Sequence, residues 1–133
     1  MITVLDYGAG NVRSVINAIE TLGHDVKVVS HAHDIESAEK LVFPGVGSFG
    51  SMMRILKEKK LVAPLRKYLL ADRPFLGICL GMQALFGTSE ESGDVEGLGI
   101  FPGQSRRFDI PSAVPHIGWN GIHIKQSSPL FNG

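Results

Sequence analysis

Residues 75–83 read Phe-Leu-Gly-Ile-Cys-Leu-Gly-Met-Gln, an apolar run that meets a cysteine with a glycine two positions away on each side. The pattern Gly77-x-Cys79-x-Gly81 is typical of a nucleophile elbow, where the chain leaves a strand and enters a helix at one strained residue. Bulky side chains two positions before or after that residue would clash, which accounts for both glycines. The stretch therefore predicts a strand, an exposed cysteine and a helix over 81–86, at the carboxyl edge of a sheet.

The elbow also predicts a chemistry for Cys79. The amino terminus of the helix would lie beneath the sulfur, where its partial positive charge favours the thiolate. The backbone N–H of Leu80 would point at an oxyanion that develops during attack on a carbonyl. The alternative is a buried structural cysteine at a tight turn, since cysteine is often buried. The strand, the two glycines and the helix together favour the catalytic interpretation.

Outward from the elbow, short apolar runs alternate with stretches of helical spacing. We expect strands at 2–5, 25–30, 41–43 and 75–78, and helices at 12–22, 52–59, 61–71 and 81–86. Asn11 and Gly23 flank the first helix as candidate N-cap and helix stop. The alternation predicts an α/β fold with a mainly parallel sheet. Residues 90–99 are polar and rich in glycine, so we expect a surface loop, and Asn120-Gly121 between two apolar triplets predicts a hairpin.

Two glycine-rich turns follow expected strands. Residues 44–47, Pro-Gly-Val-Gly, break the third strand and would expose backbone N–H groups beside Cys79 if the two strands are neighbours. An ordinary strand-to-helix loop explains that turn equally well. Gly8-Ala9-Gly10 resembles part of a dinucleotide fingerprint, but the third glycine position holds Arg13, so a tight turn is the better interpretation.

His31 and His33 stand close together in what we expect to be a polar loop. No cysteine pairs with them, and the neighbouring carboxylates Asp34 and Glu36 have the pattern of solvated groups. We therefore expect no metal site.

Composition limits the function classes. The chain has 133 residues, the size of one domain or part of one. Thirteen Lys and Arg balance thirteen Asp and Glu, so charge gives no reason to expect nucleic acid or an anionic membrane as partner. A lone cysteine fits a reducing compartment, and no apolar run approaches the ~20 residues of a membrane span. We expect a cytoplasmic protein without a signal peptide.

The chain resembles the class I (triad-type) glutamine amidotransferases, and within them the glutaminase components of imidazole glycerol phosphate synthase, an enzyme of histidine biosynthesis. The resemblance covers essentially all 133 residues and rests on the segments 6–11, 43–50, 77–86, 97–100, 107–108 and 115–120. The last of these, Pro-His-Ile-Gly-Trp-Asn, is the most specific. The resemblance implies a three-layer, flavodoxin-like α/β fold with no cofactor and no metal.

The resemblance also implies roles for individual residues. The nucleophile, which forms a glutamyl thioester and releases ammonia from L-glutamine, would be Cys79. Backbone N–H groups for the oxyanion would come from Val46 and Leu80. The substrate would be held by Gly47, Gln83 and Glu91. Gln83 lies four residues after Cys79, which places both on one face of a helix.

In the family the ammonia passes into a cyclase (β/α)8 barrel, present as a separate subunit or as a fused domain. The resemblance implies that four residues face the barrel, namely Gly8, Asn11, Trp119 and Asn120. A single Trp is a common interface anchor, and it is at least as often a core residue. The barrel would use the ammonia to close the imidazole ring of imidazole glycerol phosphate and would release an aminoimidazole carboxamide nucleotide.

The chain departs from the family in one important respect, because the family completes its triad with a His-x-Glu pair that is absent here. Residues 129–133 also stop in mid-pattern. We therefore expect 1–133 to be an incomplete amidotransferase domain, with its carboxyl-terminal portion missing and no activity alone. His116 and His123 are the remaining candidate bases, and nothing around them favours that role. The alternatives are a catalytically incomplete regulatory or binding module, a class I glutaminase of another pathway, and a different protein with a cysteine elbow.

Overall fold

The computed structural model describes residues 1–131, and Asn132 and Gly133 lie outside the described part. Expectations about the last five residues therefore fall partly on residues whose structure is not described. Within residues 1–131, no helix is long and apolar enough to cross a membrane.

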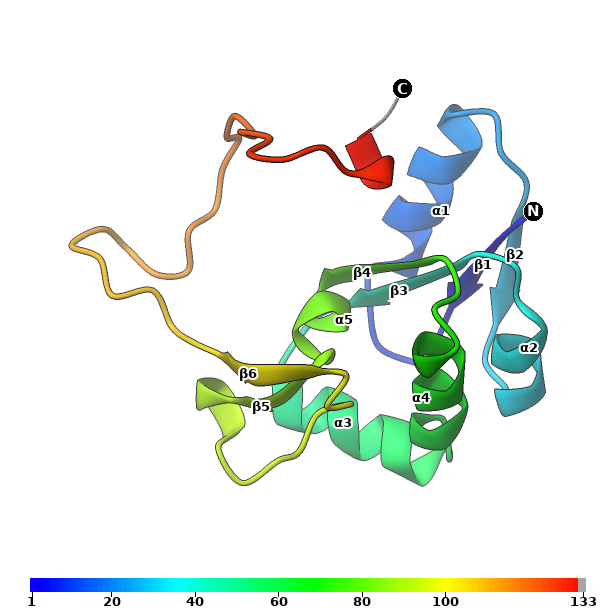
Figure 1. The fold of residues 1–133 in the computed structure, drawn as a ribbon, viewed down its shortest axis with the longest axis horizontal. Coiled ribbons are helices and arrows are strands. Elements are labelled where there is room, and N and C mark those ends of the chain that lie inside the picture. The colour runs from blue at the N-terminus through cyan, green and yellow to red at the C-terminus, as the bar shows by residue number, and fades with distance from the viewer. Residues whose placement is uncertain (132–133) are drawn as a thin grey trace.

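Four parallel strands form the main sheet (Figure 1). They are β1 (Ile2–Leu5), β2 (Val26–Val29), β3 (Leu41–Gly45) and β4 (Phe75–Cys79), in the spatial order β2-β1-β3-β4. This is the beginning of the flavodoxin-like order, in which ligands bind outside the carboxyl ends of the strands, next to the point where the order reverses. The predicted α/β fold and parallel sheet are confirmed.

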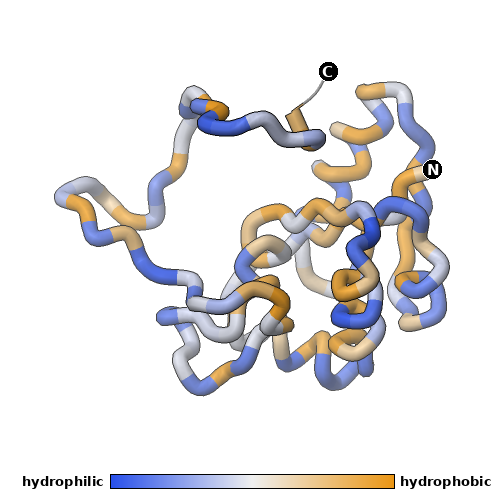
Figure 2. Tube along the Cα trace, in the orientation of Figure 1, coloured by the Kyte–Doolittle hydropathy of each residue, from blue (hydrophilic) through white to orange (hydrophobic). Residues whose placement is uncertain are grey.

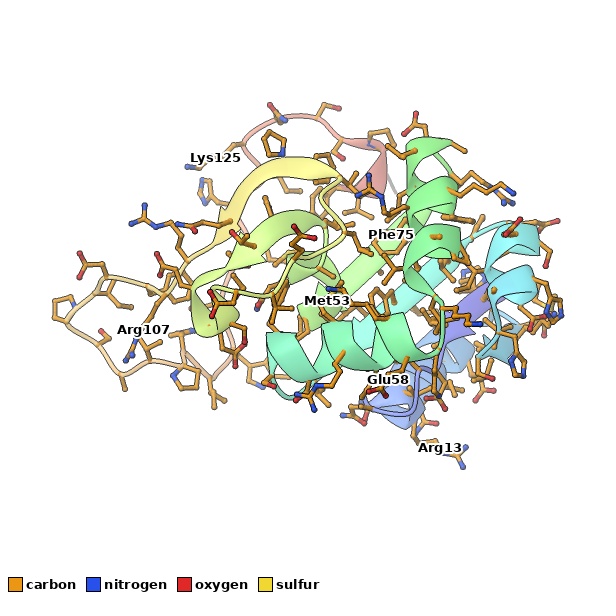
Figure 3. The ribbon with its side chains drawn as sticks, turned by 90° about the horizontal axis from the view of Figure 1, so that it is seen from below. Arg13, Met53, Glu58, Phe75, Arg107 and Lys125 are labelled. Carbon is orange, nitrogen blue, oxygen red and sulfur yellow. The ribbon has the colours of Figure 1, made fainter. Side chains whose placement is uncertain are left out.

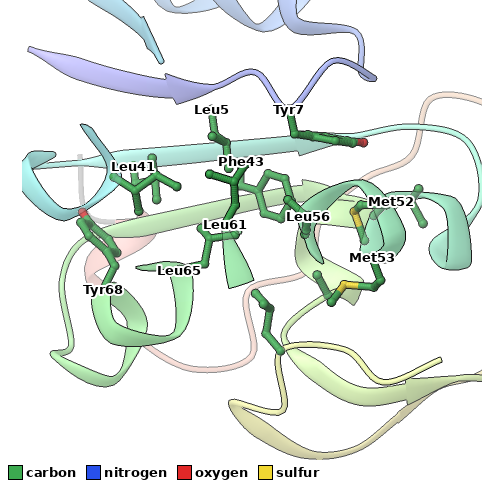
Figure 4. Close-up of a cluster of buried hydrophobic side chains, with 14 of the residues drawn as sticks. Leu5, Tyr7, Leu41, Phe43, Met52, Met53, Leu56, Leu61, Leu65 and Tyr68 are labelled. Carbon is green, nitrogen blue, oxygen red and sulfur yellow. The ribbon is translucent and has the colours of Figure 1, made fainter. Parts of the chain in front are cut away.

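Helices cover both faces of this sheet (Figure 1). Helix α1 (Val12–Thr21) lies on one face, and α3 (Phe49–Glu58) and α4 (Val62–Leu70) lie on the other, so the three layers are present. The main core fills the space between the sheet and the second pair, with side chains that include Leu5, Phe43, Met52, Leu56 and Leu65 (Figure 4).

The face that α1 covers is less tightly closed. No residue of α1 is fully buried. A groove of 470 Å³ runs between α1 and the strands β3 and β4, and Ile78 and Leu76 of β4 line it. Strand β4 is the edge of the sheet in the part of the chain that the structure describes.

Strand β3 is longer than the sequence predicted, because Pro44 does not break it. Pairing with β4 continues through Pro44↔Ile78 and ends at Gly45↔Cys79. Pairing with β1 stops earlier, at Val4↔Val42. Along a central strand, the backbone N–H groups of successive residues point alternately to the two neighbouring strands. The nitrogen of Pro44, which carries no hydrogen, points toward the β1 side, where β1 no longer pairs with β3, so no ladder hydrogen bond is lost.

The prediction of a polar loop after β2 is wrong. Residues 32–37 form the short helix α2 (Ala32–Ser37), whose apolar Ile35 is buried against the core. The carboxylates are also paired: Asp34 accepts a hydrogen bond from Lys27 at 2.9 Å, and Glu36 accepts one from Lys67 at 2.6 Å. These partners are distant in sequence, so local polarity alone suggested solvation.

The helix after the elbow is shorter than predicted. Helix α5 (Leu80–Gln83) is a single turn, and Phe86 begins strand β5 (Phe86–Ser89). Strand β5 pairs in parallel with β6 (Phe101–Ser105), and the short helix η1 (Glu90–Ser92) lies in the connection. Strand β5 forms only because it pairs with a segment 15 residues away (Phe86↔Phe101). The local apolar pattern, which does not contain that partner, predicts a helix that continues to residue 86.

The predicted hairpin at Asn120-Gly121 is wrong. Residues 106–128 contain no helix or strand, and the short helix η2 (Pro129–Phe131) follows them. Figure 1 shows this segment looping out from β6 and turning back before η2, and Figure 2 shows that it carries apolar residues. An isolated hairpin is marginally stable in water, and these residues have no sheet to join.

Candidate functional site

The backbone at Cys79 has the strain that the elbow predicts. Its φ of 57° and ψ of −117° lie in a region that residues other than glycine rarely adopt. The residue ends β4 and directly precedes α5, and its side chain is exposed. The buried structural alternative is therefore excluded. A strained, exposed thiol at the carboxyl edge of a parallel sheet is where this fold places a reacting group.

The two glycines of the elbow are required by close backbone contacts. A Cβ atom on Gly77 would lie 2.6 Å from the carbonyl oxygen of Gly81. A Cβ atom on Gly81 would lie 1.8 Å from the carbonyl oxygen of Phe43. Both distances are far below van der Waals contact, so the sharp turn at Cys79 is possible only with glycine on each side.

The turn after β3 lies directly beside Cys79, because Gly45 is the register partner of Cys79 in neighbouring parallel strands. The sequence left open whether these strands are neighbours, and the pairing settles that point. A Cβ atom on Gly45 would lie 2.8 Å from Cβ of Leu80, so the two turns are packed together. Gly47 has a φ of +94°, in the left-handed region that glycine tolerates.

A cavity of 740 Å³ opens at this point of the sheet edge. It brings together five of the residues singled out from the sequence: Gly47, Cys79, Leu80, Gln83 and Glu91. Val46 is not among its lining residues and lines the groove beside α1 instead. Gln83 stands one helical turn from Cys79, as expected, and Glu91 reaches the cavity from η1. A volume of this size accommodates a small amino-acid substrate with room to spare.

Glu91 also has a structural contact that the sequence did not predict. Its Oε2 accepts a hydrogen bond from the backbone N–H of Phe49 at 3.0 Å. Phe49 is the first residue of α3, where backbone N–H groups lack partners within the helix. The carboxylate therefore joins the η1 connection to the helix that follows the Gly47 turn.

Further residues of the cavity were missed in the sequence. Among them, Glu90 accepts hydrogen bonds from Nε of Arg106 at 3.1 Å and from the backbone N–H of Arg107 at 2.8 Å. The N–H of Arg107 and, after it, the guanidinium of Arg106 hold the pKa of Glu90 below its usual range. Arg107 lies on the segment that leaves β6 (Figure 3). The only sequence signal for these residues was the Arg107-Phe108 pair, which contributes to the family resemblance but implies no specific role.

The four residues expected to face a partner lie on two separate parts of the chain. Gly8 and Asn11 belong to the turn between β1 and α1, at the carboxyl edge of the sheet. Trp119 and Asn120 belong to the irregular segment after β6. Trp119 has a relative exposure of 103%, so it is not a core residue. The side-chain nitrogen Nδ2 of Asn120 lies 3.3 Å from Nε2 of the His116 ring.

None of the five histidines is among the residues that line the cavity. His116 and His123 lie on the exposed segment after β6. Pro115, which directly precedes His116, lines the cavity. His31 and His33 stack at a ring-centroid distance of 6.1 Å, beside Asp34. In residues 1–131 no group of three or more His, Cys, Asp or Glu side chains is arranged to hold a metal ion.

Comparison with known proteins gives consistent results. Residues 3–133 match the family model described as glutamine amidotransferase class-I. The chain is 49% identical over 134 residues to the chloroplastic imidazole glycerol phosphate synthase hisHF of Arabidopsis thaliana, covering 99% of this chain and 23% of that protein. It is 43% identical over 133 residues to imidazole glycerol phosphate synthase subunit HisH of Desulfitobacterium hafniense, covering 100% of this chain and 63% of that protein.

The chain thus spans less than two thirds of the length of both relatives. Among solved structures, a crystal structure of glutamine amidotransferase superposes with a TM-score of 0.71 at 22% identity. That superposition covers 85% of this chain and 59% of the other. It supports the arrangement of strands and helices described above.

Proposed function

Because the chain belongs to the class-I glutamine amidotransferase family, we propose that it is the glutaminase component of imidazole glycerol phosphate synthase. It would hydrolyse glutamine to glutamate and ammonia, for use in histidine biosynthesis. The observation that carries this proposal is the cavity in which the strained, exposed Cys79 meets Gln83 beside the Gly47 turn. The relatives from Arabidopsis and Desulfitobacterium, both named imidazole glycerol phosphate synthase, support the choice of pathway.

The proposed chemistry begins with the Cys79 thiolate, which attacks the side-chain amide carbon of glutamine. The resulting oxyanion would accept hydrogen bonds from the N–H groups of Val46 and Leu80. As the oxyanion collapses, the C–N bond breaks and the amide nitrogen takes up a proton to leave as ammonia. Water then hydrolyses the glutamyl thioester to release glutamate and the thiol. Gln83 and Glu91 would hold the amino-acid end of the substrate, together with the backbone at Gly47. This reaction needs neither metal nor cofactor.

The proposal includes a partner and a location. Ammonia would pass to a cyclase (β/α)8 barrel, either a second subunit or a fused domain, and would not be released. The names hisHF and HisH of the relatives are consistent with both arrangements. Gly8, Asn11, Trp119 and Asn120 would face the barrel. We place the protein in the cytoplasm, since the single cysteine fits a reducing compartment.

Covalent labelling tests the assignment directly. The full-length protein is treated with a glutamine-mimicking electrophile, and the adduct is mapped by mass spectrometry. We expect labelling of Cys79, protection by glutamine, and loss of ammonia release in Cys79→Ala. Labelling without any glutamine turnover would favour a regulatory module of the same fold. Cys79 that glutamine does not protect would contradict the proposal and favour an unrelated cysteine-elbow protein.

A further inference from the structure

Ser89 is a buried polar residue in the wall of the candidate site. In residues 1–131 only two polar or charged residues are buried, Thr3 with an exposure of 4% and Ser89 with 3%. Ser89 is the one of the two that lines the cavity. Burial of a hydroxyl is unfavourable unless hydrogen bonds replace its hydration, and alanine would fill the same place without that cost. The proposed chemistry gives this serine no role.

The hydroxyl of Ser89 holds the backbone of Glu91. Its Oγ accepts the backbone N–H of Glu91 at 3.3 Å, and Ser89 is the N-cap of η1. A helix of three residues supplies few partners for its own N–H groups, so a side-chain cap contributes to its order. Ser89 is itself fixed, because it ends β5 and is the register partner of Ser105 in β6. The small second sheet therefore determines where η1 begins.

Glu91 is held at a second point, through its side chain. Its Oε2 accepts the backbone N–H of Phe49 at 3.0 Å, and among the described residues its Oε1 accepts no hydrogen bond. Oε1 is therefore left for a ligand in the cavity. Helix η1 has no buried residue, and its other polar contact, between Glu90 and the segment of Arg106 and Arg107, is exposed. Such a connection opens easily, so loss of one anchor would let the carboxylate leave the cavity.

We propose that Ser89 is a positioning residue for Glu91, whose carboxylate it keeps aimed at the α-ammonium group of glutamine. This inference rests on the proposed glutaminase function and deepens it. Loss of the cap leaves the chemistry at Cys79 intact, but it lowers the fraction of molecules in which η1 can bind glutamine. The apparent affinity falls with that fraction, so the effect is on KM and not on kcat.

The matched pair Ser89→Ala and Ser128→Ala tests the inference. Ser128 holds η2 in the same way, since its Oγ accepts the backbone N–H of Leu130 at 3.3 Å, and it is not among the residues that line the cavity. Each variant removes one hydroxyl that accepts the N–H two residues later. Glutamine hydrolysis is measured on the full-length protein assembled with its cyclase partner, and the reaction driven by ammonium salt is measured in parallel.

We expect Ser89→Ala to raise KM for glutamine roughly 3- to 10-fold, in the range of one lost helix cap, and to leave kcat and the ammonium-driven rate within about 2-fold of the wild type. Ser128→Ala should leave KM unchanged. An unchanged KM in Ser89→Ala, or an equal rise in Ser128→Ala, would overturn the inference. A wild type that hydrolyses no glutamine would instead reject the proposed function.

A double-mutant comparison separates positioning from direct contact with the substrate. In the Glu91→Ala background there is no carboxylate left to hold, so the additional change Ser89→Ala should raise KM no further. The same fold-increase in that background as in the wild type would overturn the inference, because Ser89 would then act independently of Glu91.

A measurement without Ser89→Ala covers the case in which this variant fails to fold. Hydrogen exchange of individual amides is followed by NMR in full-length Cys79→Ala, which can bind glutamine without consuming it. The Glu91 amide should exchange more slowly than that of exposed Glu96, for which the described residues offer no acceptor. Saturating glutamine should slow the Glu91 amide further, because binding selects the ordered state of η1. Exchange as fast as at Glu96, or exchange that glutamine does not change, would overturn the inference.

Discussion

The carbonyl oxygen of Phe43 in β3 occupies the space directly above Gly81 in α5, so that a Cβ atom on this glycine would lie 1.8 Å away. The contact joins the centre of the sheet to the helix after the nucleophile. Because Phe43 belongs to the buried core, its backbone has little freedom to move. The position of Cys79 above the sheet edge therefore depends on the absence of a side chain two residues later.

The first prediction concerns this contact. Gly81→Ala should destabilise the full-length protein by about 3 kcal/mol or more, the upper end of overpacking costs, because backbone rather than a flexible side chain must move. Gly93→Ala is the matched control, since nothing lies within 4 Å of its Cβ position and its φ is −55°. That control should change stability by less than about 1 kcal/mol. Denaturant unfolding checks both, and equal stability of the two variants would contradict the close contact.

The elbow was predictable because its signals are local. A strand, two glycines and a cysteine within nine residues determine the strained turn, and the alternation of apolar runs determines the parallel sheet. Features set by distant partners were not predictable. Pro44 continues β3 because β1 has already ended beside it, and β5 exists because Phe101 pairs with Phe86.

The second prediction separates two roles of Glu91. In Glu91→Gln the amide oxygen can still accept the Phe49 N–H, but the charge that would attract the ammonium group of glutamine is lost. We expect KM for glutamine to rise roughly 10-fold, as for the loss of one hydrogen bond to a charged group, with stability retained. Glu91→Ala should raise KM and also lower the melting temperature.

Gln83→Ala provides the comparison for that experiment, because Gln83 lines the same cavity and, within residues 1–131, its side chain makes no hydrogen bond to α3. It should raise KM without a loss of stability. All three variants should keep synthesis driven by added ammonium salt, which bypasses the glutaminase site. Parallel loss of the glutamine-driven and ammonium-driven reactions would assign these residues a structural role instead.

The third prediction concerns pH. The folded-state pKa of Glu90 lies below its ordinary value of 4.5, because the N–H of Arg107 and the Arg106 guanidinium bind the carboxylate. A lowered pKa means that the ionised form stabilises the fold above 4.5, and that this contribution is lost as pH falls through the folded-state value. The melting temperature of the wild type should therefore exceed that of Glu90→Gln at neutral pH and converge with it in acid.

Glu20→Gln is the control for that pH series, since Glu20 is an exposed acid on α1, away from the cavity. Its melting temperature should follow the wild type at every pH. If the difference in melting temperature between the wild type and Glu90→Gln persisted unchanged below the folded-state pKa of Glu90, the carboxylate would act through its shape rather than its charge. The magnitude should be small, because the group is exposed and solvent screens the pair.

The fourth prediction is that the 133-residue chain does not hydrolyse glutamine by itself. Attack by Cys79 needs a proton acceptor, and departure of ammonia needs a proton donor. No histidine is among the described residues that line the cavity, and a single-turn helix cannot protonate a leaving amine. General acid–base catalysis contributes roughly 10²- to 10⁴-fold, and removal of one member of a catalytic unit can cost more.

The measurement is ammonia release from glutamine by the purified 133-residue chain, with and without the cyclase barrel and its nucleotide ligand, beside Cys79→Ala. We expect both proteins to show the same background rate. Turnover that depends on Cys79 would mean that a histidine of this chain reaches the thiol. His116 would then be the first candidate, because its neighbour Pro115 lines the cavity. His116→Ala would decide between it and His123, since only loss of the true base would return the rate to that of Cys79→Ala.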